Sequence, residues 1–398
     1  MFSALDSRYS SRLTPLADVI GEENFVYFMS VWSLAYAECV NQGTYLPLYT
    51  DRIELYRRVS AKERTTKHQM VALIQVLEED HPGVTFHYGL TSEDIMANSR
   101  FTQVDLAISK INSLLTEAQQ HIITISEPVK TFVLSHTHGQ PATPIKLEPY
   151  LRAKFKHLSL IRPAFRFGGS NGQLTALAYA TGIDDFANLG ASWLRRVKHH
   201  HKDIETSKIV TPAADCGLLQ VGPSNEATFL SAISVCLKGR ALARALWDHC
   251  QRKILGTVSP SGQAGSSAMP QKNNPIDAEL AEGCFSNAYH IFLNSLEANC
   301  DSRGLRDLSN SVVNRQMMDG WCFLYLGLRS LISFLSKASY DRSAIIKELK
   351  QHPESLTELL RYYMQVEEGK SDPYWELKER PPTDFDETIS RMSNWSIM

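Results

Sequence analysis

The sequence predicts an all-α protein built around a bundle of long helices. Apolar residues recur at 4-3-4-3-4 spacing from Val104 to Ile122, and leucines recur at 4-3-4 spacing from Leu324 to Leu335. Both spacings place the apolar side chains on one face of a helix. Residues 226–253 and 276–298 are further long stretches without a proline, and the alternation typical of strands is scarce. We therefore expect these four segments to form a long-helix bundle.

The composition bounds the classes of function. The chain has 398 residues, 43% of them hydrophobic, which suits two or three domains with a sizeable core. The net charge of −2 gives no basic field for nucleic acid or for an anionic membrane. An anionic small molecule would have to be held by local arginines and lysines. We therefore expect a small-molecule ligand and neither a nucleic-acid nor a membrane partner.

The cysteines and the first residues indicate a cytoplasmic protein. Seven cysteines are scattered without a C-x-x-C pair, as expected of thiols in a reducing compartment. The opening MFSALDSRYSSR lacks the apolar run of a signal peptide. We expect the chain to remain in the cytoplasm.

Local signals mark the ends of the long helical segments. The sequence Thr91-Ser92-Glu93-Asp94 matches the capping pattern that starts a helix. The stretch 257–275 links two long helical segments and has about the length at which a loop is usually functional or disordered. The tail beyond Gly369 is polar.

Three short polar segments stand out at the expected helix ends. They read TSEDI at 91–95, THGQPATP at 137–144 and GSSAMPQKNNP at 265–275. Each has an inert explanation: a helix cap, a structural histidine, or a flexible loop with a solvated lysine. Helix N-termini from distant segments can also meet and bind carboxylates. Hydrolase and nucleotide-loop motifs, namely G-x-S-x-G, G-x-x-x-x-G-K-[ST] and G-x-G-x-x-G, do not occur.

The third segment closely resembles the G-S-S-x-M-P-x-K-x-N-P loop of the fumarase/aspartase superfamily. The other two segments, together with "NPID" after the loop, resemble the adenylosuccinate lyase family. The resemblance implies a three-domain helical fold, with an N-terminal helical domain at 1–90, a central long-helix bundle at 91–335 that carries the catalytic loop 257–275, and a short C-terminal helical domain at 336–398. It also implies a homotetramer whose active sites take segments from different subunits. It implies release of fumarate by anti elimination from adenylosuccinate and from its imidazole counterpart (SAICAR) in purine biosynthesis. It implies no metal and no other cofactor.

The resemblance also assigns catalytic roles. Ser266 would be the base that removes a proton from the succinyl carbon, and His138 would be the acid that protonates the leaving nitrogen. A serine can act as a base only where its alkoxide is stabilised and water is excluded. Lys272 and Asn274 would hold the carboxylate beside the carbanion, on a loop that closes over the substrate. Glu279 would orient His138.

Further residues would bind the rest of the substrate. Bidentate arginines are the expected grip on a phosphate in a chain without a general basic field. The family pattern places a carboxylate at Thr91 and Ser92, and the nucleotide end at Arg8, Tyr9, Arg306, Ser311 and Arg315. The remaining predicted substrate-binding residues are His68, Thr137, Gln140, Gln220, Ser267 and Met269.

Several positions depart from the family pattern. Gln69 stands where the family has an acidic residue, the glycine segment 168–172 is altered, and Gly304-Leu305 replaces Trp-Gln. All of these bear on the amine half of the substrate. One alternative is therefore a related lyase that removes fumarate from a different N-succinyl compound. Another is a non-catalytic scaffold, against which the joint presence of Ser266 and His138 argues.

Overall fold

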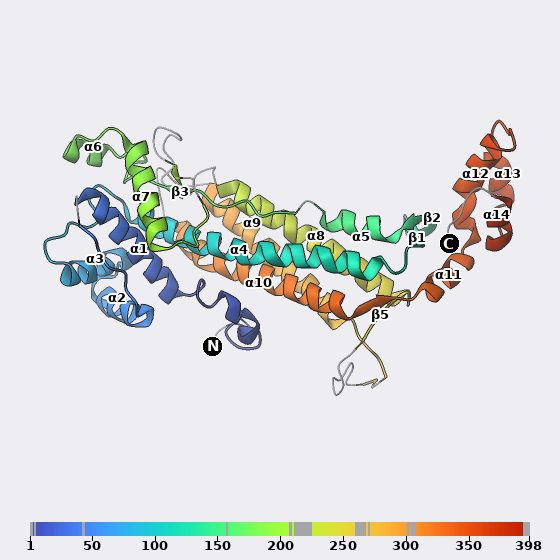
Figure 1. Cartoon of the computed structure of the whole chain (residues 1–398), viewed down its shortest axis with the longest axis horizontal. Helices are drawn as coiled ribbons and strands as arrows, with labels where there is room; N and C mark the ends of the chain where they lie inside the picture. Colours follow the sequence, from blue (N-terminus) through green and yellow to red (C-terminus); the bar gives the residue numbers. More distant parts are fainter. Residues whose placement is uncertain are drawn as a thin grey trace. The chain divides into compact units, whose positions relative to one another are not determined.

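The computed structural model confirms the all-α class (Figure 1). It describes residues 3, 5–41, 44–156, 158–206, 209–210, 225–258, 268–269, 271–300, 303 and 308–392. These residues are mostly helical, with short strands that pair only in twos within the described ranges. None of the described helices is long and apolar enough to span a membrane.

The four longest helices of the described chain coincide with the four predicted segments. They are α4 (Ser92–Ser126), α8 (Glu226–Gln251), α9 (Ile276–Cys300) and α10 (Ser309–Lys337). The periodic residues are buried, from Val104 at 0% to Ile122 at 1% exposed in α4, and from Leu324 to Leu335 in α10. The spacing therefore marks the faces that pack into the core of this chain.

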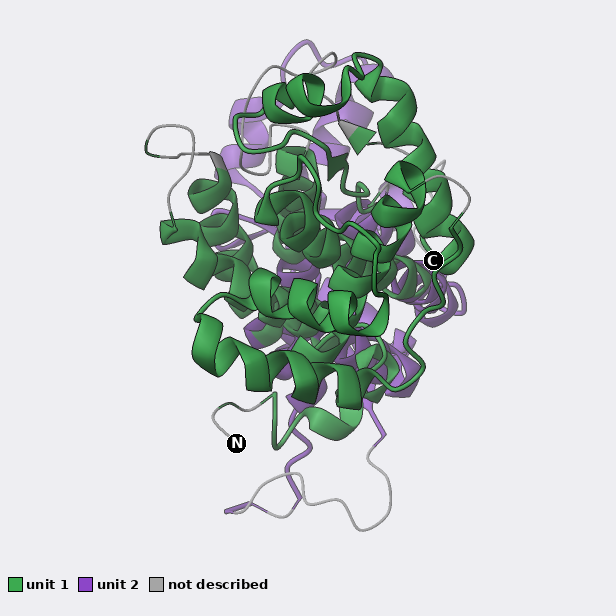
Figure 2. Cartoon of the chain, turned by 90° about the vertical axis from the view of Figure 1, so that its left-hand side faces the viewer, with its two compact units in different colours: residues 1–113, 158–237, 284–326 green, residues 114–157, 238–283, 327–398 purple. Residues whose placement is uncertain are grey.

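The chain divides into two compact units, coloured separately in Figure 2. Unit 1 comprises residues 1–113, 158–237 and 284–326, and unit 2 comprises 114–157, 238–283 and 327–398. The four long helices each contribute one part to unit 1 and the other part to unit 2. The division into three domains at residues 90 and 335 stays a prediction.

Unit 1 surrounds a helix that is apolar on every side. Every residue of α1 (Glu22–Val40) from Asn24 to Glu38 is buried, as expected of a helix without a polar face. It packs against α2 (Arg52–Thr66), α3 (Gln69–Asp80) and α7 (Phe186–His200). The other short elements of unit 1 are η1 (Ser10–Leu16), α6 (Thr175–Thr181) and the parallel pair β3 (Phe165–Arg166) and β4 (Ile209–Val210).

Edge-to-face aromatic packing fixes α1 against α7. The rings of Trp32 and Trp193 lie 5.0 Å apart at 89°, and Tyr36 lies 5.1 Å from Trp193. Both buried indoles are satisfied: Trp32 donates to Thr102 Oγ1 at 2.9 Å, and Trp193 donates to the Trp32 carbonyl at 2.9 Å. The core of unit 1 is therefore specific in geometry as well as apolar.

Unit 2 carries a hairpin and the C-terminal helices. The hairpin pairs β1 (Phe132–Thr137) with β2 (Gln140–Lys146), and a second antiparallel pair joins β5 (Leu255–Thr257) to β6 (Ala338–Tyr340). The remaining elements are α5 (Leu147–Phe155), α11 (Arg342–Lys350), η3 (Pro353–Leu356), α12 (Thr357–Val366), α13 (Tyr374–Glu379) and α14 (Phe385–Arg391). The expectation that the THGQPATP segment lies at a helix end was wrong, because these residues form the turn and second strand of the hairpin.

A buried polar network joins the end of α8 to the hairpin and to α11. Arg252 forms a two-point ion pair with Glu348, at 2.7 Å for both bonds, and donates to the Leu134 carbonyl at 2.9 Å. His249, which is 2% exposed, shares a 2.7 Å hydrogen bond between its Nδ1 and the Tyr340 hydroxyl. Burial, together with the nearby charge of Arg252, lowers the pKa of His249 from 6.5 to about 4.

We predict that acid destabilises unit 2 through His249. Neutral His249 contributes its stabilisation fully above its unfolded pKa of 6.5, and this contribution is lost as the pH falls towards about 4. Lowering the pH from 7.5 to 4.5 should cost about 2 to 3 kcal/mol through this group. Urea unfolding at the two pH values measures the loss, and His249→Gln should lose correspondingly less. An equal loss in both proteins would contradict the assignment.

Candidate active site

The first candidate segment starts the long helix α4, as predicted. The Thr91 N–H donates to Asp94 Oδ2 at 3.0 Å, which is the reciprocal bond of a capping box. Thr91 and Ser92 are half-buried at this helix N-terminus. The free N–H groups and positive partial charge there favour a carboxylate or phosphate. Thr91 and Ser92 thus lie at a helix N-terminus, where the local electrostatics suit an anion.

Asp94 also holds the glycine segment against the start of α4. Its carboxylate is 0% exposed and accepts hydrogen bonds from the N–H groups of Gly168 and Gly169, both at 2.9 Å. The Arg166 guanidinium forms an ion pair with it, also at 2.9 Å. Gly169 has φ of +63°, and a Cβ there would lie 3.2 Å from the Gly89 carbonyl oxygen, so glycine is required. These contacts therefore hold the start of the altered segment 168–172 beside the first turn of α4.

Two histidines lie close to this helix start. The predicted residue His68 is exposed and caps α3, its Nδ1 accepting from the Val71 N–H at 3.4 Å. His87, which sequence reasoning missed, has a buried Nδ1 without a hydrogen-bond partner among the described residues. Burial lowers the pKa of His87, the negative charge of Asp94 opposes this, and His68 lowers it again. The only sequence signal for His87 was its place four residues before Thr91.

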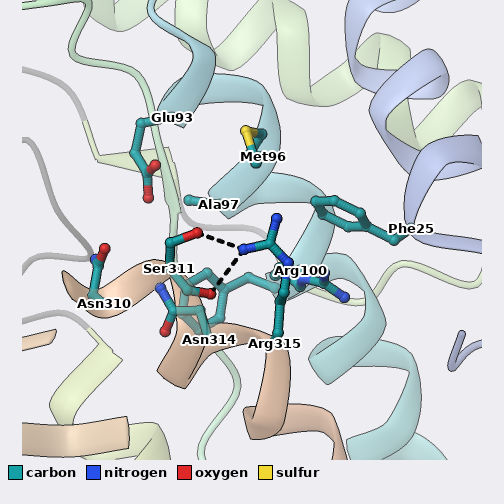
Figure 3. Close-up of a pocket in the computed structure, with 10 residues that line it drawn as sticks. Phe25, Glu93, Met96, Ala97, Arg100, Asn310, Ser311, Asn314 and Arg315 are labelled. Atoms are coloured by element: carbon teal, nitrogen blue, oxygen red, sulfur yellow. Dashed lines mark hydrogen bonds between the residues drawn. The ribbon is translucent and has the colours of Figure 1, made fainter. Parts of the chain in front are cut away.

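A small pocket in unit 1 brings the start of α4 and the start of α10 together (Figure 3). Its volume of about 40 Å³ is room for roughly three waters, so it suits a small oxyanion and not a nucleoside. Within it, Arg315 Nη1 donates to the Ser311 hydroxyl at 2.6 Å and to the Ser311 carbonyl at 3.2 Å. The lining residues are Phe25, Glu93, Met96, Ala97, Arg100, Phe101, Asn310, Ser311, Asn314 and Arg315.

Arg100 is the second guanidinium of this pocket, and the sequence analysis missed it. It forms an ion pair with Glu22 at 2.7 Å and lies 3.7 Å over the Phe25 ring. Burial lowers the pKa of Arg100, Glu22 raises it, and the charge of Arg315 lowers it again. Two guanidiniums therefore act on one small space, which one carboxylate, that of Glu93, also lines (Figure 3).

The N-terminal pair Arg8-Tyr9 lies at the start of η1. Tyr9 is half-buried and its carbonyl accepts from the Arg12 N–H at 3.0 Å, while the Arg8 side chain is exposed. Neither residue lines the pocket of Figure 3. Their predicted contact with the nucleotide stays a prediction.

His138 stands at the tip of the hairpin in unit 2. Thr137 pairs with Gln140, which leaves His138 and Gly139 as a two-residue turn with φ of 54° and 75°. Positive φ at both central residues is the requirement of a type I′ turn. All four residues are exposed. The three predicted residues Thr137, His138 and Gln140 are therefore displayed together on one rigid turn.

The base of the predicted catalytic loop is pinned in unit 2. The Asn273 amide donates to the Thr257 carbonyl at 2.6 Å and to its hydroxyl at 3.1 Å, which ties the loop to the end of β5. The Lys272 N–H donates to the Met269 carbonyl at 2.9 Å, and both side chains are exposed. Asn274 is half-buried just before α9. The predicted residues Ser266, Ser267, Gln220 and Arg306 lie outside the described residues.

Glu279 lies in the first turn of α9. Its Oε1 accepts a hydrogen bond from Trp247 Nε1 at 3.1 Å. Among the described residues, the Glu279 carboxylate thus accepts this hydrogen bond from an indole, whereas the predicted role requires a bond with the imidazole of His138. Its role in orienting His138 stays a prediction. Within the described ranges, no three His, Cys, Asp or Glu side chains gather as a metal site requires.

Comparison with known proteins finds similarity to adenylosuccinate lyases over most of the chain. Residues 302–391 match the family model described as adenylosuccinate lyase C-terminal. The chain is 26% identical to the adenylosuccinate lyase of Buchnera aphidicola, over 94% of this chain and 86% of that protein. It is 26% identical to that of Haemophilus influenzae, over 95% and 87%. The resemblance found in the sequence motifs is therefore confirmed over most of the chain's length.

Solved structures share the fold of this chain. The 3-carboxy-cis,cis-muconate lactonizing enzyme from Pseudomonas putida is similar with a TM-score of 0.69 and 15% identity, covering 97% of this chain and 86% of that one. A fumarate lyase from Mesorhizobium sp. BNC1 gives a TM-score of 0.62 and 13% identity, covering 96% and 85%. The predicted helical fold is therefore confirmed.

We predict that Asp94→Asn loosens the attachment of the glycine segment to α4. The change keeps the size of the side chain but removes the charge that Arg166 and two glycine N–H groups face, which should cost about 2 to 4 kcal/mol of unfolding free energy. Hydrogen exchange at Gly168 and Gly169 should accelerate strongly. Asp105→Asn is the matched control, since Asp105 is equally buried in α4 but binds Arg162 and Thr206. Unchanged exchange at the two glycines in Asp94→Asn would refute the clamp.

Proposed function

We propose that this chain releases fumarate by anti β-elimination from N-succinyl nucleotides, converting adenylosuccinate to AMP and SAICAR to AICAR in purine biosynthesis. Similarity to adenylosuccinate lyases over 94% of the chain is the observation that carries the proposal. The pairing of two anion-binding settings in unit 1 supports it. One is the α4 N-terminus at Thr91 and Ser92, suited to a succinyl carboxylate, and the other is the two-arginine pocket, suited to a phosphate.

The proposed reaction moves two protons. The Ser266 alkoxide takes a proton from the succinyl carbon, and the electrons left there are stabilised by the adjacent carboxylate, which Lys272 and Asn274 hold. As the C–N bond breaks, its electron pair goes to the nitrogen, and His138 donates a proton to it. A C=C bond forms, so the products are fumarate and the free amine. The exposed position of His138 on a rigid turn suits such a donor.

We further propose a cytoplasmic homotetramer whose sites combine segments of different subunits. The 4-3-4 face of α4 does not require a second copy to bury it, since those residues are already buried in one chain. The support lies on α8 instead. Leu230 and Leu237 are 53% and 41% exposed and stand seven residues apart, on one helix face. An apolar face of this kind is covered in a helical assembly.

A direct assay tests the reaction. Adenylosuccinate incubated with the pure protein should yield fumarate, followed by its ultraviolet absorbance. Ser266→Ala and His138→Gln should each lower kcat at least a hundred-fold while substrate binding is largely retained, because each change removes a proton carrier. His121→Gln, a histidine on α4 outside the site, is the control. Full activity of His138→Gln would move the acid role elsewhere.

A different N-succinyl compound is the second candidate substrate. Gln69 opens α3 directly after His68, where the family carries an acidic residue. Fumarate release from a non-phosphorylated N-succinyl amine, with none from adenylosuccinate, would favour this alternative.

We predict opposite effects for the two members of the Arg100–Glu22 ion pair on AMP affinity. Arg100→Gln removes a positive charge from the proposed phosphate pocket and should weaken AMP binding about 10- to 100-fold. Glu22→Gln breaks the same ion pair but removes a competing carboxylate, so AMP binding should be unchanged or tighter. Titration calorimetry measures both, with adenosine as the ligand lacking phosphate. Equal weakening by the two substitutions would show that Arg100 acts only through the ion pair.

A further inference from the structure

A second cavity lies in unit 2, beside the strand that follows His138. It lies between β2 and the C-terminal elements η3, α12 and α13, and its volume is about 480 Å³. That volume is within the range of small-molecule sites. It shares no residue with the proposed substrate-binding set. Its lining consists of Pro141, Ala142, Thr143, Glu354, Ser355, Thr357, Glu358, Arg361, Tyr362, Tyr374, Leu377 and Lys378.

Two buried polar groups at this cavity have no hydrogen-bond partner in the described chain. Arg361 binds Asp372 through Nη2 at 3.1 Å, but its Nε–H is covered and has no acceptor. Ser355 is 3% exposed, and its hydroxyl also has no partner. Unsatisfied buried groups are rare because each costs about 1 to 3 kcal/mol. Arg361 lines the cavity and arginine can only donate, so its guanidinium suits an acceptor such as a carboxylate.

The charges on the cavity are balanced and of both signs. Arg361 and Lys378 supply two cations. Within the described residues, no carboxylate lies in ion-pair range of Lys378. Its ammonium lies 4.7 Å from the ring centre of Trp375. Glu354 and Glu358 supply two carboxylates. Glu354 pairs with His352 at 3.0 Å, while Glu358 accepts one hydrogen bond from the Thr143 hydroxyl through Oε2. A ligand with charge of one sign would meet both attraction and repulsion here, whereas a zwitterion would match both.

Aromatic rings complete the lining. Tyr362 is 55% exposed and Tyr374 is 44% exposed, and the Arg361 guanidinium lies 5.2 Å from the Tyr374 ring centre. Partly exposed tyrosines around a cavity offer apolar contact area at little entropic cost. We propose that this cavity binds a free aromatic amino acid as a zwitterion. The ligand carboxylate meets Arg361 and Lys378, its ammonium meets Glu358, and its ring packs against Tyr362 and Tyr374.

The test titrates the full-length protein with three probes that differ in one charge each. L-phenylalanine has both charged groups, 3-phenylpropionate lacks the ammonium, and phenethylamine lacks the carboxylate. The proposal predicts saturable binding of L-phenylalanine in the millimolar range or tighter, with each of the other probes at least ten-fold weaker. Calorimetry or ligand-observed NMR measures this. Absence of saturable L-phenylalanine binding, or equal affinity for all three probes, would overturn the proposal.

Matched substitutions identify the site. Arg361→Gln should abolish the preference for L-phenylalanine over phenethylamine, and Glu358→Gln should abolish the preference over 3-phenylpropionate. Arg342→Gln and Glu367→Gln, exposed charges outside the cavity, should change neither preference. Should the Arg361 change unfold α12, as a melting curve would show, Tyr362→Ala still tests the site, because it should remove the preference for L-phenylalanine over L-alanine. Unchanged preferences in the folded variants would place the binding elsewhere.

Discussion

The buried carboxylate of Asp94 is the constraint on which the candidate site depends. A charge taken out of water is unfavourable unless donors surround it, and here those donors are two glycine N–H groups, the Thr91 N–H and the Arg166 guanidinium. The hydrogen bonds to this one carboxylate therefore hold the start of α4 beside a segment that lies more than 70 residues later in the sequence. The same bonds fix the first turn of α4 against this segment.

Positive charge at the pocket of Figure 3 comes from single placed groups. The chain as a whole carries a net charge of only −2, so attraction has to come from single placed groups. Near the start of α10, Ser311 and Arg315 lie four residues apart on one face of the helix. Arg100 of α4 adds a second guanidinium, and its carboxylate partner, Glu22, is partly exposed to solvent. Solvent weakens the neutralisation by Glu22, so part of the charge of Arg100 acts on the pocket.

Periodicity and capping could be predicted from the sequence because both are local. The apolar face of α4 and its start at Ser92 follow from residues within a few turns of each other. The hairpin could not be predicted, because Pro141 and Pro144 within β2 are residues that argue against a strand. Arg100 could not either: a basic residue within a helix is usually a surface charge, and its burial depends on Glu22, 78 residues away. The same holds for His87, whose burial is a tertiary effect.

The turn at the hairpin tip determines how its histidine is presented. Both central positions of a type I′ turn need positive φ, and histidine is one of the few non-glycine residues enriched in that region. His138 and Gly139 adopt φ of 54° and 75°, and the pairing of Thr137 with Gln140 closes the turn around them. The hairpin thus holds position 138 at its tip with the imidazole exposed, and the proposed proton transfer needs an imidazole that the substrate can reach.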